Sequence, residues 1–168
     1  MRAARDRVRA HVVRMETKND VVSTIEAQRR SLNRLIGGCN DDRTAYRGVA
    51  FASPAQNEAL LAMSRRRSVF IEELSSIVRR LGGKPRRSGS PFAGVRHSLF
   101  KLRAVVSGAK HLGDELGECV RIGGTVVDTY ERAIEKTSWP KDTGDTVTAQ
   151  MEELRLDHET VRRWRGAL

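Results

Sequence analysis

The spacing of apolar residues constrains the fold of this chain most, because they recur at steps of three, four and seven residues along nearly its whole length. Such spacing lines up apolar side chains along one face of an α-helix. The alternating pattern of a half-buried β-strand is nearly absent. The pattern predicts long helices over residues 20–52, 54–81, 110–136 and 143–166, with a shorter one over 91–107. We therefore expect an all-α protein.

Residues that begin and end helices punctuate this pattern. Ser53-Pro54-Ala55-Gln56 predicts a helix start, with an N-cap serine, a proline at the first helical position and a glutamine able to close a capping box. Leu81-Gly82-Gly83-Lys84-Pro85 predicts a helix end at a glycine C-cap, and Ser90-Pro91 predicts another start. Gly37 and Gly38 interrupt the first helix, which predicts a close helix–helix approach or a kink there.

The long segment between the second and third long helices predicts the topology. At 1.5 Å per residue the second long helix spans roughly 40 Å, and residues 91–107 would cover about 25 Å of the return. The flanking loops can supply the rest. We therefore predict a ferritin-like four-helix bundle with a long B–C crossover that contains an extra helix. A five-helix array with short connections is the alternative.

The chain length and charge suggest one bundle domain over residues 19–168 behind a basic N-terminal extension, residues 1–18. The net charge is +10, and residues 1–14 hold five arginines against Asp6 alone. A balance of this kind attracts nucleic acid or anionic lipid. No apolar run is long enough to span a bilayer and no secretory signal is evident, so we expect a cytoplasmic protein. Cys39 and Cys119 match no metal or redox spacing, which predicts buried free thiols.

The sequence lacks the ligand pattern of a ferritin-like metal site. Such a site needs Glu-x-x-His pairs, whose spacing places both ligands on one helical face. The residues three positions before the four histidines are Val8, Gly94, Gly108 and Arg155. We therefore predict no metal, no cofactor and no catalytic residues. The weak candidate metal ligands are Glu73, Glu118 and His158, and His158 is expected to be a hydrogen-bonded core histidine.

Several motifs follow one another over about residues 19 to 165: Leu32-Asn33-Arg34-Leu35-Ile36, Asp41-Asp42 with Tyr46, Glu73-Leu74, the Leu81–Pro85 turn, Tyr130-Glu131-Arg132-Ala133, and Asp157-His158 with Arg162. Together these motifs resemble a bacterial ferritin-like family of unknown function. The resemblance implies a helical bundle. The family pattern Glu-Arg-Gly-Glu-Asp is replaced here by Val120-Arg121-Ile122-Gly123-Gly124, so both of its glutamates are missing. The family pattern begins just after Met15, which leaves Met1 and Met15 both open as the start.

These observations favour a non-enzymatic bundle that acts through protein contacts, as a homo-oligomer or with another protein. The alternative is an electrostatic nucleic-acid binder of the DNA-protecting type, and a metal-dependent ferritin-like oxidase is third. The run Arg65-Arg66-Arg67 is expected to be ordinary solvated surface. The basic residues that the nucleic-acid alternative would use are Arg2, Arg5, Arg7, Arg9, Arg86 and Arg87.

Overall fold

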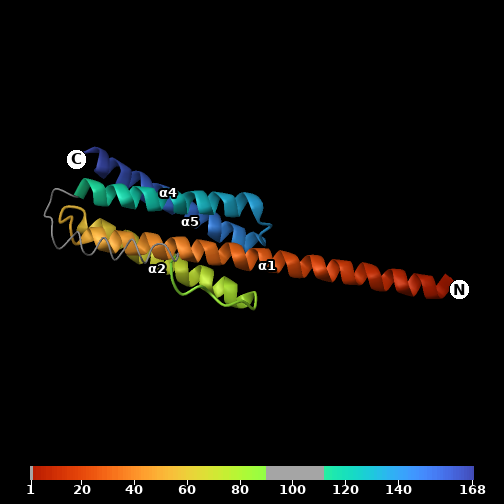
Figure 1. The fold of residues 1–168 in the computed structure, drawn as a ribbon. Helices are drawn as coiled ribbons and strands as arrows, with labels where there is room; N and C mark the ends of the chain where they lie inside the picture. The colour runs from red at the N-terminus through yellow and green to blue at the C-terminus, as the bar shows by residue number, and fades with distance from the viewer. Residues whose placement is uncertain (1, 90–111) are drawn as a thin grey trace.

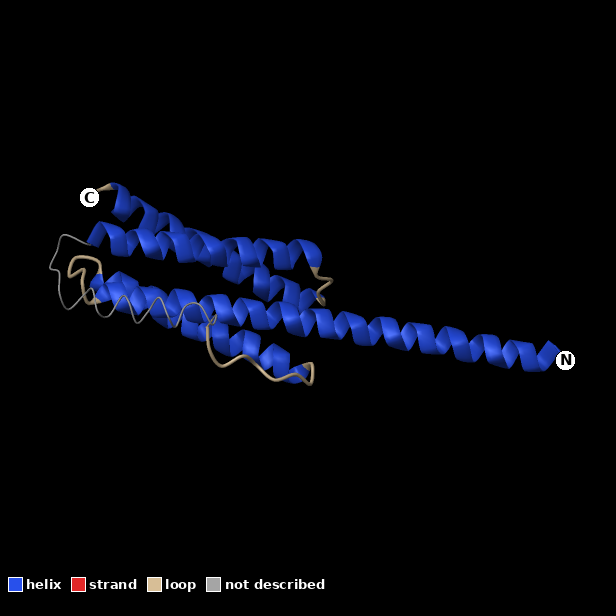
Figure 2. Cartoon of the chain, in the orientation of Figure 1, coloured by secondary structure: helices blue, strands red, loops and turns tan. Residues whose placement is uncertain are grey.

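A computed structural model describes the backbone of residues 2–89 and 112–168, and the side chains of these ranges from Asp20 onward. Within these ranges the regular structure is helical throughout (Figure 2). The helices are α1 (Arg2–Ala50), α2 (Asn57–Arg80), α4 (Leu112–Lys136) and α5 (Lys141–Gly166). The expectation of an all-α protein is therefore confirmed, and the four described helices are consistent with a four-helix bundle.

Two antiparallel helix pairs build the bundle. A short turn joins α1 to α2, another joins α4 to α5, and α1 packs against α4 between the pairs (Figure 1). Helices α2 and α4 run in the same direction, so the end of α2 and the start of α4 lie at opposite ends of the bundle. The predicted shorter helix over 91–107 and the predicted start at Ser90-Pro91 lie outside the described residues.

The apolar stripes form the core in two clusters. One is built around residues such as Leu35, Leu74, Val126 and Leu154, and the other around Val49, Leu60, Leu116 and Val161. Gly38 allows α1 to approach α4 closely, because a β-carbon there would lie 3.3 Å from Val126 Cγ2. The close approach expected at the glycine pair is therefore confirmed.

The ends of α2 differ in how well they were predicted. The helix begins at Asn57, because Ser53–Gln56 forms a turn in which the Ser53 hydroxyl bonds the Gln56 side chain. The predicted start at residue 54 was therefore wrong. At the other end Gly82 adopts a φ of +73°, and the N–H groups of Gly82 and Gly83 donate to the carbonyls of Arg79 and Val78. This is a Schellman motif, as the glycine C-cap predicted.

Helix α1 is longer than predicted, since it begins at Arg2 rather than near residue 20. Its N-terminal part runs on past the ends of the other helices (Figure 1). Val21 and Val22 stand at the start of the helix predicted over residues 20–52, but they are 58% and 53% exposed. Among the described side chains of α1, Gln28 is the first buried one. None of the helices in the described ranges has both the length and the apolar character that a bilayer crossing needs.

Candidate functional site: the polar centre of the bundle

A buried arginine lies between carboxylates from two other helices. The Arg67 side chain on α2 is fully buried, and its Nε donates to Asp42 Oδ2 on α1 at 2.6 Å. Its Nη1 lies 3.0 Å from Asp157 Oδ2 on α5. The latter pair is at ion-pair distance but is not aligned as a hydrogen bond, so both atoms remain without a hydrogen-bond partner among the described residues. Arg67 thus ties α1, α2 and α5 together at one level of the bundle.

Aromatic rings and a second arginine complete this group. The guanidinium carbon of Arg67 lies 5.5 Å from the ring centroids of both Tyr46 and Phe70, which is within cation–π range. Arg66, which is half-buried on α2, places its Nη1 2.6 Å from Asp157 Oδ1. Asp42, Tyr46, Arg66, Arg67 and Asp157 are called the Arg67 cluster below.

Burial dominates the electrostatics of the cluster. Burial raises the pKa of the Asp42 carboxyl, and the charge of Arg67 opposes this rise. Burial by itself would lower the pKa of Arg67, but the charges of Asp42 and Asp157, the Tyr46 side chain and the hydrogen bond to Asp42 together outweigh it, and the pKa is raised. Arg67 therefore stays protonated and cannot serve as an acid or base. What the cluster can do is hold a permanent positive charge in the interior against two carboxylates.

A glycine of α4 faces the cluster beside His158. A β-carbon on Gly123 would lie 3.7 Å from each of Asp42 Oδ1, Tyr46 Oη and His158 Nδ1. The His158 ring also lies over Gly124. His158 is half-buried rather than a core residue, so its predicted place in the core was wrong. Gly123 and Gly124 have no side chains, and this leaves room for the His158 ring at the edge of the bundle. Burial lowers the pKa of His158, which keeps its imidazole neutral at neutral pH.

A second polar chain crosses the core nearer the other end of α5. The Tyr130 hydroxyl donates to Gln150 Oε1 at 2.7 Å, and Gln150 Nε2 donates to Glu73 Oε2 at 2.6 Å. Cys39 Sγ lies 3.2 Å from Tyr130 Oη. Burial raises the pKa of the Cys39 thiol to about 12 and also raises that of Cys119. Both cysteines are buried and free, as predicted, and neither has the thiolate character of a reactive cysteine.

The three weak metal candidates do not come together. Glu73 is bonded to Gln150, eight residues before His158 on α5, which separates the two levels by about 12 Å. Glu118 forms a two-point bond with Arg121, at 2.7 and 2.6 Å. In the described ranges no three His, Cys, Asp or Glu side chains are grouped in a way that could hold a metal ion.

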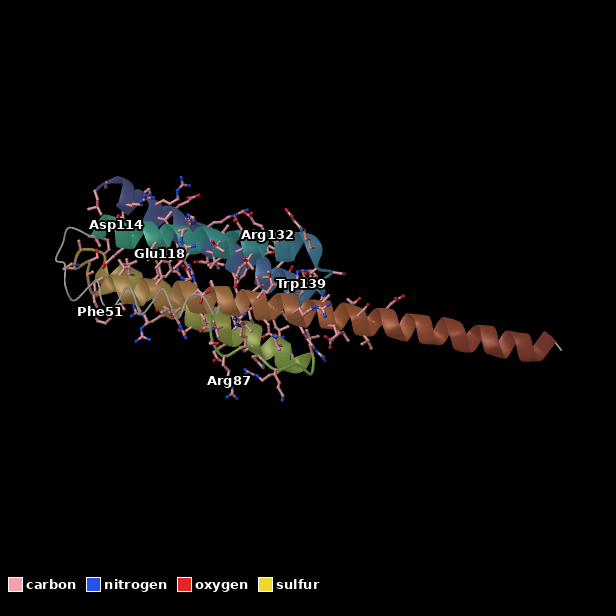
Figure 3. All side chains as sticks on the ribbon, in the orientation of Figure 1. Phe51, Arg87, Asp114, Glu118, Arg132 and Trp139 are labelled. Carbon is pink, nitrogen blue, oxygen red and sulfur yellow. The ribbon has the colours of Figure 1, made fainter. Side chains whose placement is uncertain are left out.

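The basic candidates are similarly separated. Arg86 is held within the chain, since its backbone N–H donates to Asn33 Oδ1 and its guanidinium to the carbonyls of Ser88 and Gly89. Arg87 is exposed and lies on the side of the bundle away from α4 and α5 (Figure 3). The side chains of Arg2, Arg5, Arg7 and Arg9 lie outside the described ones.

Sequence reasoning missed the Arg67 cluster, because Arg67 was read as part of a solvated arginine run. The signal was nevertheless present. Arg67 stands seven residues after Leu60 and seven before Leu74, so it occupies a core-facing position of α2. Asp42 lies between the buried Cys39 and Tyr46 in the same way, and Asp157 follows Leu154. A charged residue in the apolar register of three separate helices predicts a buried ion-pair group.

The fold and this site define a class of protein: an all-helical bundle whose interior is crossed by a buried arginine–carboxylate cluster rather than by an apolar core alone. The family model of a domain of unknown function, DUF2383, matches residues 28–136, and the chain therefore belongs to this family. The matched residues hold Asp42 and Arg67 but end before Asp157. No curated protein matches the chain. The match supports the expectation of a domain of unknown function, while the bacterial, ferritin-like character of the family stays a prediction.

Proposed function

We propose that this protein is a non-enzymatic, ferritin-like helical bundle that acts by binding another protein, with a second copy of the chain as the favoured partner. The observation that carries the non-enzymatic part is Arg67, whose guanidinium lies between Asp42 and Asp157 with no exposed surface. A permanent cation already balances the carboxylates that face the bundle centre. The site therefore offers neither an acid–base pair nor a free set of ligands.

The directions of the helices support the ferritin-like part of the proposal. Helices α2 and α4 run the same way, so the chain between them has to connect opposite ends of the bundle. This is the arrangement that distinguishes a bundle with a long crossover from one whose helices simply alternate in direction.

The N-terminal part of α1 supports the contact role. It runs past the bundle (Figure 1). Val21 and Val22 are both exposed and precede Gln28, the first buried side chain described in α1. Most helices gain their stability by packing an apolar face against a neighbour. A second copy can supply that neighbour through a two-fold contact, in which the same surface meets itself. The proposed contact centres on Val21 and Val22.

Sedimentation equilibrium tests this role. The unaltered protein is expected to show a concentration-dependent dimer, and the double variant Val21→Ser/Val22→Ser is expected to shift it toward monomer. The matched control is Val69→Ser/Leu156→Ser, which removes two exposed apolar side chains from α2 and α5 (54% and 61% exposed) and is expected to leave the dimer intact. A monomer at every concentration, or equal weakening by both double variants, would overturn the proposed contact.

Nucleic-acid binding is the second candidate, and the basic character of the same overhanging helix favours it. Five arginines within residues 1–14 could contact phosphates, and each contact steepens the dependence of binding on salt. If this candidate is right, deleting residues 1–14 weakens retention on duplex DNA and flattens its salt dependence. If the protein-contact proposal is right, neither the full chain nor the deletion binds DNA measurably at about 0.15 M salt, where the Debye length is about 8 Å.

A further inference from the structure

The chain that follows α2 lies along one side of α1. The residues of α1 that meet this segment are spaced four apart, so they share one side of the helix: Arg29, Asn33, Gly37 and Asp41. Arg29 packs against Gly83 at the beginning of the segment, and Gly89 meets the Asp41 carboxylate at its end. Residues 83–89, called the strap below, therefore run beside α1 for about 18 Å. They lead from the end of α2 toward the end of the bundle where α4 begins (Figure 1).

Asn33 holds the middle of the strap by its backbone. The backbone N–H of Arg86 donates to Asn33 Oδ1 at 2.7 Å, and Asn33 Nδ2 donates to the carbonyl of Lys84 at 3.3 Å. Just ahead of the strap, Arg29 Nε donates to the carbonyl of Leu81 at 2.7 Å. One side chain of α1 thus bonds both a donor and an acceptor of the strap, and it does so through main-chain groups.

The strap contributes little to the core of the bundle. None of residues 83–89 is buried, and none belongs to either apolar cluster. The guanidinium of Arg86 bonds the carbonyls of Ser88 and Gly89, at 2.9 and 2.7 Å, so the strap is also tied to itself. A segment with few buried apolar contacts opens at a lower free energy than the core it lies on.

We infer that Asn33 latches the strap to α1, and that the strap opens as a unit while the four described helices stay packed. Opening breaks the two hydrogen bonds of Asn33 but separates no residues of the apolar clusters. It also uncovers the side of α1 beneath the strap. Gly37 is buried there, and a β-carbon on it would lie 3.3 Å from Arg86 Nη1.

Limited proteolysis of the full chain with trypsin tests the latch, because the protease cuts after Arg87 when the strap leaves the surface of α1. The measured quantity is the initial rate of this cut, resolved by mass spectrometry. We expect Asn33→Ala to raise the rate about tenfold or more, since two hydrogen bonds are lost, while the helix content measured by circular dichroism stays the same. The matched control is Gln28→Ala, which removes a 2.6 Å hydrogen bond from the same helix to a different loop, at Ser138. This control should leave the rate after Arg87 unchanged.

The urea dependence of the same cut in the unaltered protein is the second measurement, and it does not require any variant to fold. A local opening exposes little surface, so the rate should stay nearly constant until the bundle begins to unfold, once it is corrected for trypsin activity on a peptide. A rate that rises in step with global unfolding would show that the strap does not open separately. An unchanged rate in Asn33→Ala, or equal acceleration by Asn33→Ala and Gln28→Ala, would overturn the latch.

Discussion

Arg67 is the residue on which the interior of this bundle depends most. A long cationic side chain without exposed surface is tolerated only because Asp42 and Asp157 stand on either side of it, and Tyr46 and Phe70 flank its guanidinium. Buried ion pairs add little net stability compared with a well-packed apolar group. A buried ion pair does make the fold sensitive to the loss of one partner, because the remaining partner is then buried and charged without a counter-ion.

The Arg67→Met variant should expose this dependence. It keeps much of the side-chain volume but leaves the buried Asp42 without its cation and Asp157 with Arg66 alone, so we expect the free energy of unfolding at pH 7 to fall by about 3–5 kcal/mol. Urea unfolding followed by circular dichroism measures it. The control is Arg79→Met, because Arg79 is exposed and loses only an ion pair with Glu72 at 3.7 Å. We expect this control substitution to lower the free energy of unfolding by about 0–1 kcal/mol. Similar small costs for both would contradict a structural role for the Arg67 cluster.

His158 gives the stability of the fold a pH dependence of known sign. Its pKa is lowered in the folded protein by burial, so the unfolded chain binds the proton more readily. Its contribution to stability is full above the unfolded pKa of about 6.5 and falls as the pH drops from there toward the lower folded pKa. Asp42, whose pKa is raised, acts in the opposite sense, so the comparison has to isolate His158.

Comparing the unaltered protein with His158→Gln isolates this contribution. Between pH 7.5 and pH 5 the free energy of unfolding should fall more steeply for the unaltered protein than for the variant. Asp42 titrates in both proteins, so the difference between the two slopes reports His158 alone. Parallel curves, or a steeper fall in the variant, would show that burial does not disfavour the charged imidazole.

At the scale of the helices, features that depend only on neighbouring residues of the chain were predicted best from the sequence. The apolar stripes of α2, α4 and α5 come from spacing within each helix, and their placement was close. The C-cap at Gly82 was also predicted, because its signal is the dipeptide itself. The start of α2 was missed by three residues, since Ser53 and Gln56 bond each other in a turn ahead of the helix rather than capping its first turn.

Core truncations test the helical phase that underlies these predictions. Leu74 on α2 and Leu154 on α5 are buried in the same cluster, so Leu74→Ala and Leu154→Ala should each lower the free energy of unfolding by about 2–5 kcal/mol. Leu156→Ala is the control, because Leu156 lies on the same helix but is 61% exposed. An unchanged melting temperature for either buried variant would mean that the assigned core face is wrong.

The polar centre shows why a site is harder to predict than a stripe. Residue type suggested that Arg65-Arg66-Arg67 is a surface run, whereas position within the helix buries only Arg67. Which carboxylates it would meet depends on α1 and α5, which are distant in the sequence. Even a correct helical phase therefore could not have identified Asp42 and Asp157 as its partners.

At the scale of the whole molecule, two features are combined in one chain. The bundle is crossed by buried polar groups, while the N-terminal part of α1 extends beyond it (Figure 1). Val21 and Val22, which precede the first buried side chain described in α1, are exposed. The family match covers residues 28–136, which begins at the first buried residue described in α1 and leaves out both the overhang and α5. The overhang was predicted as an extension but not as a continuation of the helix, because its sparse apolar residues give no packing signal.

We propose that the guanidinium of Arg67, rather than a metal ion, balances the carboxylates at the centre of this bundle. Metal analysis by inductively coupled plasma mass spectrometry, on protein purified without chelator, tests it most directly. We expect no stoichiometric iron or manganese, and no change in metal content for Glu73→Ala or His158→Ala. Stoichiometric iron or manganese in the native protein that is lost in Glu73→Ala would contradict the claim.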